Sequence, residues 1–210
     1  MAGTMPHAIF VETDVDGDGL VGAYAAELPG CAVFARSDEE AASGMPLRVS
    51  RFTAWLREQG ETVPAFVGDN WYEVERAAAM PADGGRQRAA FTLDELPPSD
   101  DEFAAWMRWL ELAREELAAA LDAGDAESVA DLLDAVERQD VAFIRELGGQ
   151  APELAADPVD RLYAARDALT EALEAAGPSH DGVRRILRLG IADDLRAAEA
   201  LRSAEATRSA

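Results

Sequence analysis

The sequence predicts an α+β domain over residues 1–96, a small antiparallel sheet with one helix, and then an all-α antiparallel four-helix bundle over residues 97–210. Three observations predict this organisation. The first half holds short apolar runs separated by turns rich in Asp, Gly and Pro, as expected of strands. A proline-rich stretch at residues 96–100 reads as a stiff linker. Beyond it, apolar residues recur at spacings of three and four, which is the pattern of amphipathic helices.

The first expected strand covers residues 7–13, where Ile, Phe and Val alternate with other residue types. A loop rich in Asp and Gly, residues 14–19, leads into a second apolar run from Leu20. The loop opens like an EF-hand, Asp-x-Asp-x-Asp-Gly, but Ala25 stands at the twelfth position, where that calcium loop needs a bidentate Glu. Strands rather than helices flank it, so we interpret it as a polar hairpin turn.

A second hairpin follows, with runs of strand length at residues 24–28 and 32–35. Pro29 and Gly30 form the turn between them, because Pro fixes one φ and Gly allows a positive one. Cys31 comes directly after the turn and is the only cysteine. No internal disulfide can therefore form, as expected of a protein in a reducing compartment.

One long helix is expected after this hairpin. Ser37 and Glu40 form a capping box at its start. Gly60 supplies a left-handed C-cap, and Pro64 prevents any continuation of the helix.

Two further strands are expected before the linker, a fourth strand at residues 71–79 and a short edge strand at residues 89–93. Simple alternation in the fourth strand places its side chains in two sets, one on each face of the sheet. These sets are Tyr72, Val74 and Arg76 on one face, and Trp71, Glu73 and Glu75 on the other.

Four helices of about twenty residues, joined by three short loops, are expected in the second half. Each has a start or stop signal of its own. The first helix starts at Ser99 with Glu102 and ends at Gly124, and the second starts at Asp125 and ends at Gly148. The third starts at Asp157 with Pro158 and ends at Gly177, and the fourth starts near Ser179. The first helix carries one continuous apolar stripe, formed by Phe103, Trp106, Leu110, Ala113, Leu117 and Leu121.

The chain is strongly acidic, with 41 Asp and Glu against 19 basic residues, all of them Arg, and a net charge of −22. There are 16 acidic residues and 7 Arg before residue 97, and 25 and 12 after it, so neither half is basic. This charge argues against binding to nucleic acid, which needs a basic surface, and against docking on anionic membranes. The first residues do not have the pattern of a signal peptide, and no apolar run is long enough to span a membrane. We therefore expect a cytoplasmic protein.

Part of the first half resembles a known family. The sequence Tyr-x-x-x-Leu-Pro-Gly-Cys from Tyr24, followed by a short strand and by Ser-Asp-Glu-Glu-Ala at a helix start, resembles the HicB-like antitoxin domain over about forty residues. The resemblance implies a sheet of three or four strands crossed by one helix, related to a degraded RNase H fold. It also implies a protein partner, typically a small toxin ribonuclease, and makes Tyr24, Pro29, Gly30 and Cys31 candidate partner-binding residues. The alternative is any small α+β domain with a Pro-Gly turn.

Two segments of the second half, residues 134–147 and 184–195, resemble the DinB-like superfamily, which includes metal-dependent thiol transferases and isomerases. Active members place one histidine in the second helix and two, four residues apart, in the fourth. Here the second-helix segment has no His, and the fourth-helix pair reads as Leu189 and Asp193. The resemblance therefore implies a bundle that has lost its metal site, and we expect no cofactor.

The remaining chemistry-bearing residues give weak signals. The two histidines, His7 and His180, fall in an expected strand and in a loop. Glu137 and Asp193 could form a carboxylate metal site on facing helices, but in so acidic a chain solvated helix faces are the default interpretation. Cys31 has no His near it in sequence, and no glycine-rich phosphate loop is present.

The leading functional hypothesis is a non-enzymatic, two-domain cytoplasmic protein that binds a protein partner or acts in regulation, without direct DNA binding. The alternative is a DinB-like thiol-dependent transferase or isomerase with altered or lost metal ligands. A second apolar row on the first bundle helix, Met107, Trp109 and Leu112, predicts a homodimer held through the bundle. The same row could instead pack beneath the N-terminal domain. No small ligand is identified by the sequence.

Overall fold

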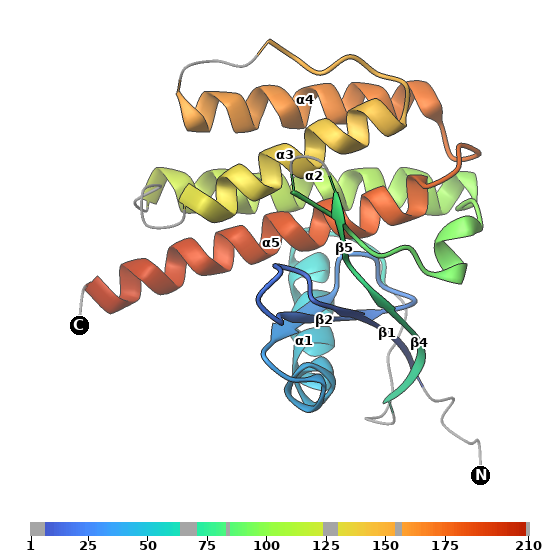
Figure 1. Cartoon of the computed structure of the whole chain (residues 1–210), viewed down its shortest axis with the longest axis vertical. Helices are drawn as coiled ribbons and strands as arrows, with labels where there is room; N and C mark the ends of the chain where they lie inside the picture. The colour runs from blue at the N-terminus through green and yellow to red at the C-terminus, as the bar shows by residue number, and fades with distance from the viewer. Residues whose placement is uncertain (1–6, 64–70, 83–84, 124–129, 154–156, 209–210) are drawn as a thin grey trace. The chain divides into compact units, whose positions relative to one another are not determined.

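The computed structural model describes residues 7–63, 71–82, 85–123, 130–153 and 157–208 (Figure 1). The chain divides into two compact units, Met1–Leu96 and Pro97–Ala210. The expected fold class is confirmed, because a four-stranded sheet packs on one helix and four further helices form a bundle. Pro64, Gly124 and Asp125, which were expected to end or begin helices, lie outside the described residues.

The sheet of the first unit has the strand order β3-β2-β1-β4. Its strands are β1 (His7–Thr13), β2 (Val21–Ala25), β3 (Ala32–Ala35) and β4 (Trp71–Ala78). β1 pairs with β2, and β2 with β3, in the expected antiparallel direction. β4 differs, because it runs parallel to β1 and makes the sheet mixed. Its direction follows from α1 (Asp38–Glu58), which lies between β3 and β4 in the chain, since a helical crossover joins strands of the same direction.

The helix α1 begins at the expected capping box. Ser37 Oγ accepts a hydrogen bond of 3.2 Å from the Glu40 amide. The buried face of α1 is spaced by threes and fours along the helix and consists of Ala41, Met45, Val49, Phe52, Thr53 and Leu56. Gly44 lets the helix approach the sheet closely, since an added Cβ would lie 3.0 Å from Val33 Cγ1.

The face of the sheet away from α1 is covered by residues 88–95. Phe10 and Tyr24 are paired in register on this face, and Phe91 stacks on Phe10 with ring centroids 4.7 Å apart. An edge strand was expected at residues 89–93, but this prediction was wrong. Residues 92–95 form a 3-10 turn, η1 (Thr92–Glu95), in which Asp94 Oδ2 accepts a 3.0 Å hydrogen bond from the Phe91 amide. The Asp side chain thus satisfies locally a backbone group that a strand would offer to a neighbour.

β4 does not alternate simply, because its register on β1 shifts at Val74. This bulge places Arg76 on the same face as Glu73, whereas the sequence predicted that it would share a face with Tyr72. Arg76 Nη2 donates to Glu73 Oε2 at 2.6 Å, and Nη1 donates to Asp38 at the start of α1. A short two-stranded ribbon follows, made by β5 (Met80–Ala82) and β6 (Gly85–Gln87).

The second unit is a bundle of four helices in contact with one another, as expected. They are α2 (Asp100–Ala123), α3 (Ala130–Glu146), α4 (Pro158–Ala176) and α5 (Val183–Arg208). Ser99 and Glu102 form the capping box of α2, and Asp157 Oδ1 caps α4 by accepting from the amides of Val159 and Asp160. α5 begins later than the expected start near Ser179, because Gly182 has a φ of 83°, which is not helical.

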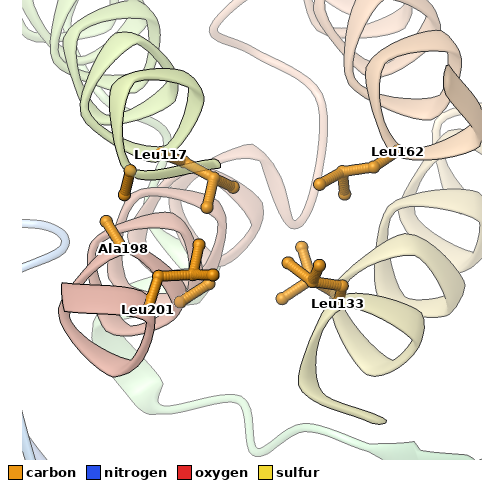
Figure 2. Packing of buried hydrophobic residues seen from close by; sticks show 8 residues of the cluster. Leu117, Leu133, Leu162, Ala198 and Leu201 are labelled. Carbon is orange, nitrogen blue, oxygen red and sulfur yellow. The ribbon is translucent and has the colours of Figure 1, made fainter. Parts of the chain in front are cut away.

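Leucines and alanines from all four helices meet at one end of the bundle. Figure 2 shows Leu117 of α2, Leu133 of α3, Leu162 of α4 and Leu201 of α5 pointing toward one another. These side chains are at most 3% exposed. Burial of this apolar surface is the main force holding the helices together.

The directions of the helices differ from a simple antiparallel bundle. α2 packs mainly on α5 and α3 mainly on α4, and each of these pairs runs parallel. Ion pairs show these directions, because a later residue of one helix pairs with a later residue of the other. Between α2 and α5 the pairs are Glu102 with Arg184 and Glu116 with Arg202, and between α3 and α4 they are Asp134 with Arg161 and Asp140 with Arg166. The antiparallel expectation assumed short loops, but residues 147–157 join α3 to α4. About eleven residues can span roughly 36 Å, more than the roughly 25 Å length of α3, so the chain can return before α4 begins.

Candidate functional site

The four residues expected to bind a partner are buried in the structure. Tyr24 and Cys31 have no exposed surface, and Pro29 and Gly30 are also buried. Gly30 has a φ of 86°, the left-handed conformation that the turn requires. The hairpin turn therefore has the local geometry that its sequence indicates, while its side chains pack inward.

A buried polar cluster surrounds the Tyr24 hydroxyl. The fully buried carboxylate of Glu12, on β1, accepts hydrogen bonds from the Tyr24 hydroxyl at 2.8 Å and from the Ala89 amide at 2.6 Å. It also accepts from Arg88, whose Nε and Nη2 lie 3.1 and 3.0 Å from Glu12 Oε2. The cluster joins β1, β2 and residues 88–89, and it pairs a charge that would otherwise be costly to bury. Sequence reasoning missed this cluster, and the signal for it was Glu12, which lies two residues after Phe10 and therefore on the same face of the strand.

A second buried polar cluster lies inside the bundle and joins three of its helices. Arg166 of α4 is 1% exposed and donates through Nη1 to Asp140 Oδ1 of α3 at 2.8 Å, and through Nη2 to Asp194 Oδ1 of α5. Asp140 and Asp194 are themselves 1% and 0% exposed. One guanidinium therefore bridges two carboxylates in the bundle interior. We call Asp140, Arg166 and Asp194 the interior triad.

Two more charged residues act on the interior triad. Arg114 of α2 donates through Nη1 to Thr170 Oγ1 at 2.7 Å, so its direct hydrogen bond goes to a hydroxyl and not to the triad. Burial lowers the pKa of Arg114, and the charge of Arg166 lowers it further. Asp193, beside Asp194 on α5, is buried as well, and its charge raises the pKa of Asp140.

The pKa values of the triad follow from burial and from mutual charge. Burial raises the pKa of Asp140 to about 7 and that of Asp194 to about 6, even though Arg166 opposes both shifts. Burial alone would lower the pKa of Arg166, but the two aspartates outweigh it and raise this pKa above its usual value. Burial therefore favours the protonated form of the two carboxyls, while Arg166 favours their ionised form.

The weak metal candidates, Glu137 and Asp193, are both buried. Glu137 Oε2 accepts a 3.1 Å hydrogen bond from Arg161 Nε, and Asp134 pairs with the same arginine at 3.4 Å. Among the residues that the structure describes, no three His, Cys, Asp or Glu side chains lie close enough together to hold a metal ion. The carboxylates of Asp140, Asp194 and Glu137 are bonded to arginines instead.

The apolar row that suggested a homodimer is mostly covered in the folded chain. Met107 and Trp109 are 9% and 4% exposed, and Leu112 is partly buried. Nearby on α2, Trp106 is stacked under the guanidinium of Arg184, with Arg184 Cζ 4.6 Å from the ring centroid. The row therefore does not form the open apolar patch from which the dimer was predicted.

The acidic loop at residues 14–19 joins β1 to β2, as the hairpin interpretation expects. Asp16 Oδ1 accepts hydrogen bonds of 2.9 Å from the amides of Asp18 and Leu20, and Arg36 pairs with Oδ2 at 3.1 Å. These hydrogen bonds and the charge of Arg36 outweigh partial burial and lower the pKa of Asp16. The carboxylate of Asp16 thus stabilises the turn.

Comparison with protein-family models, with curated proteins and with solved structures finds no match. The fold and the interior triad therefore carry the functional argument. Of the helices in the described parts of the chain, none combines the length and the apolar character needed to cross a membrane.

Proposed function

We propose that the protein is a non-enzymatic binding or regulatory protein, in which a HicB-like domain recognises a protein partner and a DinB-like bundle without metal serves as its scaffold. The bonding of the bundle's interior carboxylates carries this proposal. Asp140 and Asp194 accept from Arg166, and Glu137 accepts from Arg161. A carboxylate that neutralises a guanidinium is a poor ligand for a metal ion, because the two cations compete for the same oxygen lone pairs.

The outer edge of β4 is the surface on which we place the partner. β4 is an edge strand, and among the described residues no strand pairs with its outer side. It exposes 46% of Tyr72 and 44% of Val74, and Met80 just beyond it is 59% exposed. Exposed apolar side chains on an open strand edge suit an extended segment that adds to the sheet. The sheet edge is favoured over the turn at Pro29 and Gly30, because both of these turn residues are buried.

Charge favours a different protein over a second copy of this chain. The first unit has 16 acidic residues and 7 Arg, so a basic segment is attracted to it and another acidic one is repelled. In an antiparallel pair of two β4 strands centred on Val74, Glu73 would lie opposite Glu75, and like charges directly opposite destabilise a strand pair. The bulge at Val74 also hinders the pairing of identical edges.

The test combines identification of the partner with a measured affinity. A photoreactive amino acid at position 72, and another at the exposed Leu47 on α1 as the control, would be cross-linked in source cells. The captured protein would then be purified and titrated against the wild type, a Tyr72→Ser/Val74→Ser variant and a Leu47→Ser control. We expect the double variant to bind about thirtyfold more weakly, since two apolar contacts of about 1 kcal/mol each are lost. Equal affinity for all three proteins would remove β4 from the interface.

Metal analysis of purified protein separates this proposal from the enzymatic alternative. We expect no stoichiometric transition metal after expression in medium containing nickel, zinc, iron and manganese. One bound metal per chain, lost in a Glu137→Gln variant that folds normally, would contradict the proposal. It would favour a transferase or isomerase with altered ligands.

A further inference from the structure

In the interior triad the guanidinium of Arg166 contacts the carboxyl groups of both Asp140 and Asp194. We propose that the bundle interior is a binding site for one proton, shared between Asp140 and Asp194 near neutral pH, and that the bundle responds to pH through this site. The proposal goes beyond partner binding and does not depend on it. It concerns the bundle alone.

The charged groups around the triad come from all four helices. α2 contributes Arg114, which is bonded to Thr170 of α4. α5 contributes two further buried charges of opposite sign, Arg188 and Asp193. The remaining charged groups are paired or exposed: Glu137 with Arg161, Glu146 with Arg185, and Asp167 on the outer side of α4. Among the described residues, Arg166 bridges Asp140 and Asp194 directly.

The hydrogen bonding leaves one oxygen on each carboxyl without a donor. Asp140 and Asp194 accept from Arg166 through Oδ1, while the Oδ2 atoms of both are buried and have no hydrogen-bond partner among the residues that the structure describes. An ionised oxygen in this position has lost its hydration and gained no donor in exchange. Protonation of one carboxyl removes that charge and leaves a single carboxylate facing a single guanidinium. Because the two sites interact, the proton belongs to the pair and not to one residue.

The direction of the pH effect follows from the raised pKa values. An Asp in the unfolded chain has a pKa near its ordinary value of 3.8, while burial raises the pKa of Asp140 to about 7 and that of Asp194 to about 6. Because the two carboxyls interact, these values belong to the pair, and between these limits the folded bundle holds the one shared proton that the unfolded chain has released. The stabilisation is complete below pH 3.8 and is lost as the pH rises through about 7. One proton of difference lowers the folding equilibrium constant about tenfold per pH unit within this window.

The test is a pH titration of the aspartate side-chain carbons in the intact chain by NMR. We expect one Asp carboxyl to titrate well above the others, with a midpoint of about 6 to 7 in line with the two pKa values. This midpoint should disappear or move by more than about one unit in Asp140→Asn or Asp194→Asn. It should remain in Asp131→Asn, which removes an exposed carboxylate from the same helix.

The wild-type titration decides the proposal even if neither triad variant folds. If every Asp carboxyl of the wild type titrates below about pH 5, both triad carboxylates are ionised at neutral pH and the proposal is wrong. Where Asp140→Asn folds, its unfolding constant should lack the tenfold change per pH unit that distinguishes the wild type between about pH 4 and 6. An unchanged pH dependence in that variant would also overturn the proposal.

Discussion

Replacing Arg166 by Met removes the cation of the interior triad while keeping a long, unbranched side chain in its place. In the native bundle Arg166 donates to Asp140 at 2.8 Å and to Asp194, and all three residues are buried. Removing one partner from a buried ion pair costs about 3–5 kcal/mol, because it leaves a buried charge without compensation. Here two carboxylates lose their donor together. We therefore expect Arg166→Met to destabilise the bundle by at least the lower end of that range at pH 8, where keeping a buried carboxyl protonated costs more than it does at lower pH.

Hydrogen exchange followed by mass spectrometry measures this loss in the intact chain. At about 1.4 kcal/mol per factor of ten, a loss of 3–5 kcal/mol corresponds to exchange that is faster by about two to four orders of magnitude. The effect should appear in peptides from α3, α4 and α5, while peptides from α1, in the other unit, provide an internal reference. At pH 5 the loss should be smaller, because the two aspartates can then bind protons in place of the arginine.

A matched variant separates charge from packing. In Asp140→Leu/Arg166→Met/Asp194→Leu all three charges are removed, and replacement of a whole buried ion network by apolar residues is often neutral or stabilising by about 1–4 kcal/mol. We expect this triple variant to be more stable than Arg166→Met. If Arg166→Met alone changes bundle exchange by less than about threefold at pH 8, the triad does not contribute as argued. If the triple variant is the less stable of the two, shape and not charge dominates the interior.

Three further outcomes are expected, each measurable by urea denaturation or calorimetry. Glu12→Ala should lower the free energy of unfolding by about 3–5 kcal/mol, because it leaves Arg88 buried without its carboxylate. Arg36→Ala should lower it by less than about 1 kcal/mol, because Arg36 is 65% exposed in its ion pair with Asp16. If the two variants lose similar stability, burial does not decide how much these ion pairs contribute. Gly22→Ala should cost about 1–3 kcal/mol, because the new Cβ would lie 2.9 Å from the Tyr24 hydroxyl; a neutral effect would mean that Tyr24 can move away from Glu12. Calcium titration should show no micromolar affinity; such affinity, if abolished by Asp16→Ala, would overturn the hairpin interpretation of residues 14–19.

The elements of the fold could be predicted because their signals are local. The capping boxes at Ser37 and Ser99 and the cap at Asp157 depend on side chains only two or three residues apart, and each starts a helix where expected. Strand and helix directions could not be predicted in the same way. The parallel pairing of β4, and the parallel pairs of bundle helices, depend on where the chain re-enters the structure.

Two errors in the sheet have the same kind of cause. The bulge at Val74 is set by how β4 fits β1, and it reverses the face on which Arg76 lies. Residues 89–93 have strand-like composition, but Asp94 captures the Phe91 amide and turns the chain into η1. In both places one tertiary or side-chain contact outweighs the local preference for regular alternation.

The interior triad was overlooked because acidic residues are abundant on this chain. With 41 Asp and Glu, any single carboxylate on a helix reads as part of a solvated face. The signal was position and not residue type. Arg166 follows Leu162 by four residues and precedes Leu169 and Leu173 by three and seven, so it occupies an inward position on the apolar stripe of α4. A charged residue inside such a stripe has to find a partner within the core.

The interior triad also explains how this sequence selects one arrangement of its helices. Stripes of Leu and Ala can pack against one another in more than one register, because a shift of one turn places Leu against Leu again. The same shift, about 5.4 Å along α4, would carry the guanidinium of Arg166 away from both Asp140 and Asp194. The buried guanidinium and its carboxylate would then be unpaired at a cost of several kcal/mol, which is comparable with the whole stability of a domain. We infer that the triad fixes the register of α4 against α3 and α5. Its burial thus contributes specificity for this register rather than stability.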